Sequence, residues 1–222
     1  YDHASIRFGC TLDSFASDTD TVEVNAVAGA SSLTFKCKYL IGCDGAHSTV
    51  RHGLGLALEG FSYPIGAGLA DVRLPVNDSF KFPRLSAKGV LSVAILIDDG
   101  LWRLILPYAR DSTMDFGDRI RQAVESQFGV SKFELVWQSQ FSLHRRISSA
   151  FGRGRVVLAG DAAHLNSPVG GQGMNSGIQD AAQLVSELLK ALDLNSADLE
   201  SYVVNRRKGI SRGVNRFTNL LT

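Results

Sequence analysis

The sequence predicts a mixed α/β fold, in which a partial parallel sheet with helices accompanies an inserted, mostly antiparallel sheet. Two apolar runs, Tyr39–Cys43 and Val156–Ala159, fit strands that are covered on both faces, as strands of a parallel sheet are. Between them, from Pro64 to Gln140, several short segments have the character of strands, and a hairpin signal lies between two of them, as in an antiparallel sheet. We therefore expect the two runs to share one sheet and the middle block to form another.

Composition narrows the class of protein. The chain has 222 residues, enough for one large domain or two small ones without disulfide or metal support. Lys+Arg is 23 and Asp+Glu is 22, so bulk charge favours neither nucleic acid nor a membrane surface as a partner. No apolar stretch is long enough to cross a bilayer, so we expect no stable membrane insertion. Cys10, Cys37 and Cys43 are odd in number and form no CxxC pair, which favours a reducing, cytoplasmic compartment without a zinc site.

The first part of the chain is expected to form short strands. Apolar and polar residues alternate over Ser5–Phe8, Thr21–Val27 and Leu33–Cys37. Gly29 supplies a turn between the last two segments. The apolar run Tyr39–Cys43 then follows as the first buried strand.

The middle block is expected to be a small antiparallel sheet with one helix. Asp98-Asp99-Gly100 is a hairpin signal, because Gly tolerates positive φ. Apolar residues recur every four positions over Met114–Phe128, and Gly129 follows as a stop, so this segment is an amphipathic helix. The strands predicted around these features are Leu69–Leu74, Gly89–Ile97, Trp102–Leu106 and Leu135–Ser142.

Two helices are expected after the second buried strand. Asn175–Leu192 carries an apolar stripe at helical spacing that includes Ile178, Val185 and Leu189. Leu199–Arg216 carries a basic run, which we interpret as a solvated helix face rather than a nucleic-acid patch.

Each buried strand ends in an aspartate beside a glycine. Asp44-Gly45 follows the first strand, and Gly160-Asp161 follows the second. In parallel α/β sheets, ligands bind beyond the carboxyl ends of the strands, where an Asp can accept hydrogen bonds from ligand hydroxyls. For Asp44 alone, an ordinary Asp-Gly turn is the favoured interpretation.

The second of these motifs is longer and reads GRVVLAGDAAHLNSPVGGQGMNSGIQDA, from Gly154 to Ala181. Gly170-Gly171-Gln172-Gly173 leads into a helix that begins near Met174-Asn175. A glycine-rich turn before a helix exposes free backbone N–H groups at the positive end of the helix dipole, which suits an anion or a partly negative ring edge. The alternative is a glycine-rich connection without a ligand.

This motif and YLIGCDGAHSTVR (Tyr39–Arg51) resemble the third and second flavin-binding motifs of the FAD-dependent aromatic hydroxylases. These are single-component flavoprotein monooxygenases of the p-hydroxybenzoate hydroxylase type, and the phenol and polyketide hydroxylase branch is the most similar. The resemblance implies that residues 1–63 are the first part of an FAD-binding domain, 64–149 a substrate-binding sheet domain, and 150–222 the rest of the FAD-binding domain.

The resemblance also implies a reaction. NAD(P)H reduces FAD, O2 adds to form a flavin C4a-hydroperoxide, and this species hydroxylates a small aromatic substrate, phenolic or polyketide-like. The alternatives are an FAD-dependent reductase or epoxidase of the same superfamily, or a non-catalytic remnant that acts as a binding module. Neither the substrate nor a preference for NADH over NADPH is indicated.

The resemblance assigns site residues by position. Pro168 is expected to face the flavin near the reacting oxygen, and Arg51 either reaches a phosphate or lies on a helix surface. Arg145 and Arg146 face NAD(P)H phosphates or form surface salt bridges, and His164 is expected to be structural. The remaining cofactor-binding residues are Asp44 and Gly45 (FAD and NAD(P)H), Gly160 and Asp161 (the ribityl or pyrophosphate part of FAD), and Gly171, Gln172, Gly173, Met174 and Asn175 (the isoalloxazine edge).

One motif of the family is missing, because no GxGxxG follows a predicted strand. This absence predicts that the chain is an internal fragment without the N-terminal βαβ unit of the family. Because nothing obvious then holds the pyrophosphate, we expect the isolated chain to bind FAD poorly and to be inactive as a hydroxylase.

Overall fold

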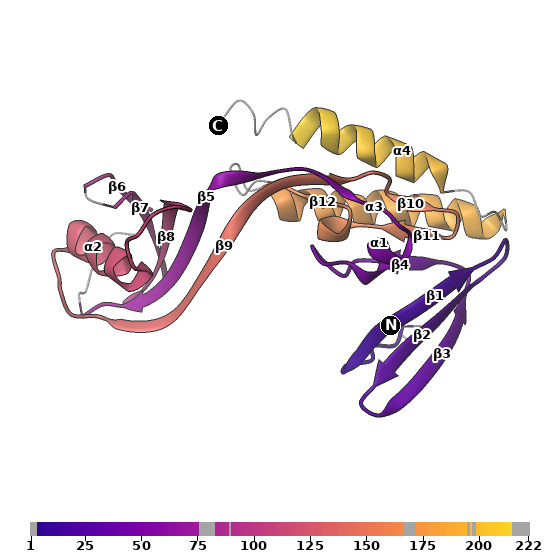
Figure 1. The fold of residues 1–222 in the computed structure, drawn as a ribbon, viewed down its shortest axis with the longest axis horizontal. Coiled ribbons are helices and arrows are strands. Elements are labelled where there is room, and N and C mark those ends of the chain that lie inside the picture. The colour runs from indigo at the N-terminus through magenta and orange to yellow at the C-terminus, as the bar shows by residue number, and fades with distance from the viewer. Residues whose placement is uncertain are drawn as a thin grey trace. The chain divides into compact units, whose positions relative to one another are not determined.

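The computed structural model describes residues 4–75, 83–88, 90–166, 172–194, 196 and 199–214. The chain divides into two compact units (Figure 1). We call residues 1–61 and 144–222 the discontinuous unit and Ser62–Leu143 the inserted unit. The mixed α/β fold is confirmed, whereas the functions assigned to the two parts stay predictions.

The discontinuous unit opens with a three-stranded antiparallel sheet of β1 (Cys10–Ser17), β2 (Val22–Ala28) and β3 (Ser31–Cys37). The strands expected near β2 and β3 are confirmed. The strand expected at Ser5–Phe8 is wrong, because β1 begins only after a turn at Gly9, whose φ is 64°. The sequence pattern hid β1 because a bulge between Leu12 and Ser14 breaks its alternation.

A second small sheet contains the two predicted buried strands. β4 (Leu40–Gly42) pairs in parallel with β11 (Val156–Leu158), and β10 (Gly152–Arg153) pairs antiparallel with β11. All three residues of β11 are buried, as expected, but Ile41 in the middle of β4 is exposed. A side chain at Gly42 would press on Val50 and Leu158, so this strand needs a glycine to lie close to its neighbours.

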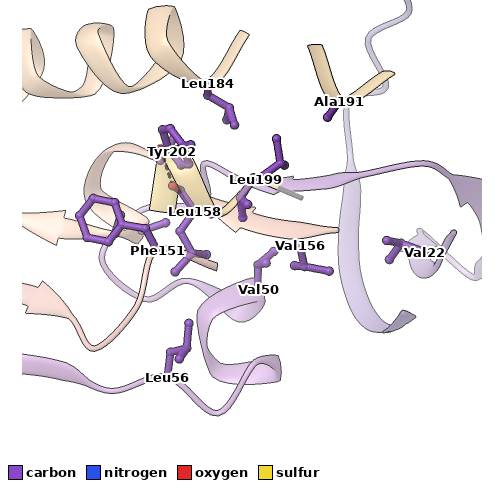
Figure 2. Packing of buried hydrophobic residues seen from close by; sticks show 14 of the residues in the cluster. Val22, Val50, Leu56, Phe151, Val156, Leu158, Leu184, Ala191, Leu199 and Tyr202 are labelled. Carbon is purple, nitrogen blue, oxygen red and sulfur yellow. Dashed lines mark hydrogen bonds between the residues drawn. The ribbon is translucent and has the colours of Figure 1, made fainter. Parts of the chain in front are cut away.

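Helices complete the core of the discontinuous unit. α1 (Thr49–Gly53) follows β4, while α3 (Gln172–Asp193) and α4 (Glu200–Gly209) follow β11 and lead into a π-helical turn at Ile210–Val214. In Figure 2, Tyr202 of α4 donates a hydrogen bond of 2.7 Å to the carbonyl oxygen of Leu158. The labelled apolar neighbours in that view are Val22, Val50, Leu56, Phe151, Val156, Leu184, Ala191 and Leu199.

The apolar stripe predicted on α3 does not mark its buried face. Ser176, Asp180, Leu184 and Ala191 are buried, whereas several stripe residues are between 41% and 60% exposed: Ile178, Val185, Leu189 and Leu192. The helix has apolar side chains on two faces. Its buried face includes the Asp180 carboxylate, whose burial requires hydrogen-bond partners. A count of apolar residues therefore selected the wrong face.

The inserted unit is built on an antiparallel sheet. The strands are β5 (Leu58–Arg73), β6 (Arg84–Ser86), β7 (Ser92–Asp98), β8 (Leu101–Ala109) and β9 (Glu134–Ser148). Their order in the sheet is β9-β5-β8-β7-β6, and the last residues of β9 pair with β12 (His164–Leu165) in the discontinuous unit. The hairpin predicted at Asp98-Asp99-Gly100 is confirmed, with φ 66° at Gly100. β5 is longer than the predicted strand Leu69–Leu74, and Gly60 near its start permits close approach of the Arg145 backbone.

α2 (Phe116–Phe128) covers one face of this sheet. Asp115 caps its N-terminus, and Gly129, with φ 67°, ends it. The predicted helix is therefore confirmed, and it begins two residues later than the predicted range. The core beneath it comprises Ala70, Val72, Leu74, Val90, Ala94, Trp102, Leu104, Leu106, Phe116, Ile120, Ala123 and Val124.

Candidate functional site

The two strand-end motifs leave the same edge of the sheet. In the parallel pair of β4 and β11, Leu40 lies opposite Val156 and Gly42 opposite Leu158. The loops that carry Asp44-Gly45 and Gly160-Asp161 therefore start side by side. This juxtaposition is what the sequence motifs predicted for a ligand-binding edge.

The first loop is organised around the start of α1. Asp44 Oδ2 accepts a hydrogen bond of 3.1 Å from the Val50 amide, and Ser48 Oγ accepts one of 2.9 Å from the Arg51 amide. Partial burial raises the pKa of the Asp44 carboxyl, but hydrogen bonds from Ser48 and from the helix amides outweigh it and hold the pKa below its ordinary value. Gly45 has φ 77° and makes the turn. Asp44 thus serves the turn and the helix start, as the turn interpretation predicts, and its contact with a cofactor stays a prediction.

Arg51 joins the two loops. Its guanidinium donates to the carbonyl oxygen of Ala162 at 3.0 Å and to that of Ala46 at 2.9 Å. The residue is 3% exposed, so the expectation of a helix-surface arginine is wrong. Burial lowers its pKa, and the nearby Asp44 charge opposes that shift. Its Nε has no partner among the described residues, and its contact with a phosphate stays a prediction.

The second loop presents an open carboxylate. Gly160 has φ 61° and begins a short 3₁₀ turn, Gly160–Ala162. The Asp161 side chain is exposed and makes no hydrogen bond with any residue that the structure describes. Ala162 and Ala163 are fully buried, so the loop packs tightly while Asp161 faces outward.

The start of α3 carries the remaining predicted cofactor residues. Gln172 and Gly173 are half-buried, and Met174 and Asn175 are exposed in the first turn of the helix. Pro168 and Gly171 lie outside the described residues, so the roles predicted for them are untested.

Asp180 was missed by the sequence reasoning. Its carboxylate is completely buried on the inner face of α3, where it binds the Gly160 amide, His164 and Arg206. The expectation that the basic run of the last helix is a solvated face is therefore wrong for Arg206. Burial would raise the pKa of Asp180, but the hydrogen bonds from these three donors hold it below its ordinary value. The available signal was an acidic residue one helical turn before Leu184 within a predicted helix.

A cationic pocket of about 300 Å³ lies beside the first loop. Five titratable side chains contribute to its wall, namely His47, Arg51, His52, His144 and Arg146, with apolar residues between them. Arg146 is the one of the two predicted phosphate-facing arginines that lines this pocket, whereas the guanidinium of Arg145 lies 5.7 Å from the centre of the Phe61 ring.

An apolar hollow of about 330 Å³ lies where Leu12, Val24 and Phe35 meet β4. Cys43 also lines it and is exposed, although it ends an apolar run. In the inserted unit Trp102 is fully buried, whereas Trp137 is 45% exposed and lies beneath the Arg103 guanidinium. No group of three or more His, Cys, Asp or Glu residues suited to a metal ion occurs in the described parts of the chain. Nor is any described helix long and apolar enough to cross a bilayer.

Known proteins similar to this chain include named hydroxylases and monooxygenases. The family model described as "FAD binding domain" matches residues 2–217. A 3-(3-hydroxy-phenyl)propionate/3-hydroxycinnamic acid hydroxylase from Mycolicibacterium gilvum is 30% identical over 94% of this chain and 37% of its own length. A rifampicin monooxygenase from Streptomyces venezuelae is 32% identical over 86% of this chain and 41% of its own length. The crystal structure of p-nitrophenol 4-monooxygenase from Pseudomonas putida has a TM-score of 0.79 at 25% identity, over 94% of this chain and 55% of that one. The chain thus spans about two fifths of the length of these curated relatives.

Proposed function

The chain belongs to the FAD-binding domain family, and from that premise we propose that it supplies part of an FAD-dependent monooxygenase that hydroxylates a small aromatic substrate. The observation that carries the proposal is the pairing of β4 with β11, which brings both strand-end aspartate loops to one edge. The named hydroxylases and monooxygenases among its relatives support the same reaction class.

The residues at this edge fit a flavin. Asp161 offers an exposed carboxylate, which suits hydrogen bonding to the ribityl hydroxyls of FAD. The first turn of α3 offers backbone N–H groups at Gln172–Asn175 for the partly negative edge of the isoalloxazine ring. When bound, FAD accepts a hydride from NAD(P)H and activates O2. The chain's own residues bind and orient the cofactor, and Pro168 is proposed to lie near the reacting oxygen.

The cationic pocket is the proposed site for the phosphates of NAD(P)H. Arg51 and Arg146 carry permanent charge, and His47 and His144 add donors at the same wall. Such a site attracts a pyrophosphate, and Ala46 places it next to the Asp44-Gly45 loop. This position supports the expectation that the first loop serves both cofactors.

The inserted unit is proposed to carry the substrate. The face of its sheet that lies away from α2 holds Leu69, Ile105 and a bidentate ion pair between Asp71 and Arg103, with both distances 2.8 Å. Half-exposed apolar residues around a fixed polar pair suit an aromatic ring with a polar substituent.

A cytoplasmic location, expected from the cysteine content, stays a prediction.

A flavin titration of the purified chain tests the proposal. Without a GxGxxG turn we expect weak, saturable binding of FAD, measured as quenching of flavin fluorescence. Asp161→Ala should weaken this binding, whereas Asp193→Ala, which removes an exposed carboxylate at the far end of α3, should leave it unchanged. Equal affinities of the two variants would refute the role of Asp161, and no binding by the parent chain would favour the non-catalytic remnant.

Reaction of the complete protein with ¹⁸O₂ separates the catalytic alternatives. A ring-hydroxylated product with one labelled oxygen supports the hydroxylase. An epoxide with one labelled oxygen supports the epoxidase, and a reduced product without label supports the reductase.

A further inference from the structure

The buried carboxylate of Asp180 is surrounded by donors. Its Oδ2 accepts hydrogen bonds from the Gly160 amide at 2.8 Å and from His164 Nε2 at 2.7 Å. Its Oδ1 accepts a hydrogen bond from Nε of Arg206 at 2.7 Å, and Nη2 of the same guanidinium lies 2.6 Å from it as an ion pair. Both oxygens therefore have donors at distances typical of strong, charge-assisted hydrogen bonds.

The partners of Asp180 are themselves fixed. An ionised carboxylate can only accept, so His164 carries its proton on Nε2, and its Nδ1 accepts from the Asn166 amide at 3.2 Å. The imidazole also stacks on Phe151, with ring centres 5.8 Å apart. Arg206 donates a further bond of 3.1 Å to the carbonyl oxygen of Ser176. His164 and Arg206 therefore hold the carboxylate in one orientation.

The Asp180 carboxylate contacts the backbone at the start of the loop that follows β11. Gly160 is the first residue of the 3₁₀ turn and has φ 61°, a conformation that favours glycine. Its amide points inward to Asp180, and the next residue, Asp161, presents its side chain to solvent. α3 lies close to this point, since a Cβ added to Gly177 would stand 3.5 Å from the Gly160 Cα.

Stability alone does not explain a charge at this position. A buried ion pair loses so much hydration that a well-packed apolar residue often stabilises a protein equally well. An apolar side chain cannot, however, fix the direction of a backbone amide. The particular contribution of a carboxylate here is a pair of acceptors at defined positions.

We propose that Asp180 is a positioning residue, which holds the Gly160 amide so that the Asp161 carboxylate faces the ligand edge. The proposal rests on the proposed function only in its claim that Asp161 then contacts FAD. The positioning itself is a property of the flavin-free chain, so the two claims can fail separately.

Hydrogen exchange of the flavin-free chain tests the positioning. In Asp180→Asn the amide has one oxygen, and the Arg206 charge takes it, so the amide nitrogen faces the Gly160 N–H and His164. We expect the amides of Gly160 and Asp161, and the Ala163 amide that bonds to the Gly160 carbonyl at 2.9 Å, to exchange about tenfold faster or more. The matched control is Glu187→Gln, the same change at a partly exposed ion pair of α3 with Lys190. Unchanged exchange at all three amides in Asp180→Asn would overturn the proposal.

FAD affinity, measured where each variant is more than nine-tenths folded, separates positioning from a purely structural role. Positioning predicts that Asp180→Asn raises Kd about tenfold while Glu187→Gln leaves it unchanged. A lower melting temperature with an unchanged Kd would show a structural role only and would overturn the proposal. If the parent chain binds no FAD, the proposed function fails, and the exchange experiment still decides the positioning.

A second variant tests the proposal if Asp180→Asn does not fold. Arg206→Lys keeps the positive charge but cannot bond Asp180 and the Ser176 carbonyl in the same geometry. It should speed exchange of the Gly160 amide by a smaller factor, about threefold. If the Gly160 amide of Arg206→Lys exchanges as slowly as in the parent chain, the role assigned to Arg206 is refuted. If Asp180→Asn is also unfolded, the same result overturns the proposal.

Discussion

Replacing Arg51 by methionine is expected to lower the free energy of unfolding by about 2–4 kcal/mol. The guanidinium is almost fully buried and bonds the Ala162 and Ala46 carbonyls at 3.0 and 2.9 Å. Each hydrogen bond to a charged group contributes about 1.5–3 kcal/mol. The desolvation of a buried arginine is relieved in the variant, which offsets part of the loss. Methionine retains an apolar chain, so the change reports mainly the loss of the bridge between the two loops.

Urea unfolding followed by far-ultraviolet circular dichroism, which reports the secondary structure of both units, measures this loss. Arg153→Met is the control, because Arg153 is exposed on β10 of the same unit, and a surface change of this kind alters stability by about 0.5 kcal/mol or less. The slope of free energy against urea should stay the same in both variants, since the folded state is otherwise intact. A loss for Arg51→Met no larger than that for Arg153→Met would refute the bridging role.

Three further predictions concern stability. The pKa of Asp180 is lowered in the folded chain, so its ionised form stabilises the protein at pH values above the unfolded pKa of about 3.9, and this contribution is lost as pH falls through the folded pKa. Between pH 7 and pH 2, the free energy of unfolding should therefore fall more steeply in the parent chain than in Asp180→Asn. Parallel curves for the two proteins would contradict this prediction. Gly68→Ala places a Cβ against the Phe116 ring and should cost about 1–3 kcal/mol in urea unfolding, whereas Gly173→Ala meets no atom within 4 Å and should cost nothing. Trp102→Ala, at a fully buried position beside Phe128, should cost about 3–5 kcal/mol by the same assay, and a cost below 1 kcal/mol would show that the inserted unit has another core.

Sequence patterns predicted those parts of the fold that depend on local periodicity. α2 was predicted from a four-residue apolar repeat and its stop at Gly129, and the β7–β8 hairpin from its Asp-Gly turn. The same patterns failed where another force overrides periodicity. β1 has a bulge, and β5 continues through Gly60, where the Arg145 backbone lies too close for a side chain.

Some residues of the candidate site were likewise predictable from local sequence patterns, and others were not. The strand-end loops were predictable, because an apolar run followed by Asp and Gly is a contiguous signal. Asp180 and Arg206 were not, since they are 26 positions apart and each has a common surface interpretation when considered alone. Arg51 shows the same limit, because the carbonyl of Ala162 is 111 positions away.

The two strand-end aspartates look equivalent in sequence, but their surroundings give them different roles. Asp44 accepts from the Val50 amide and stabilises the start of α1, which in turn presents the Arg51 side chain to the second loop. Asp161 accepts from no described residue. The bonds that stabilise its loop involve the backbone on either side, because the Gly160 amide donates to Asp180 and Arg51 donates to the Ala162 carbonyl. The loop is therefore held without using the Asp161 carboxylate, which leaves that carboxylate available to a ligand. By this reasoning the loss of Asp161 should weaken FAD binding with little effect on stability, whereas the loss of Asp44 should lower stability first.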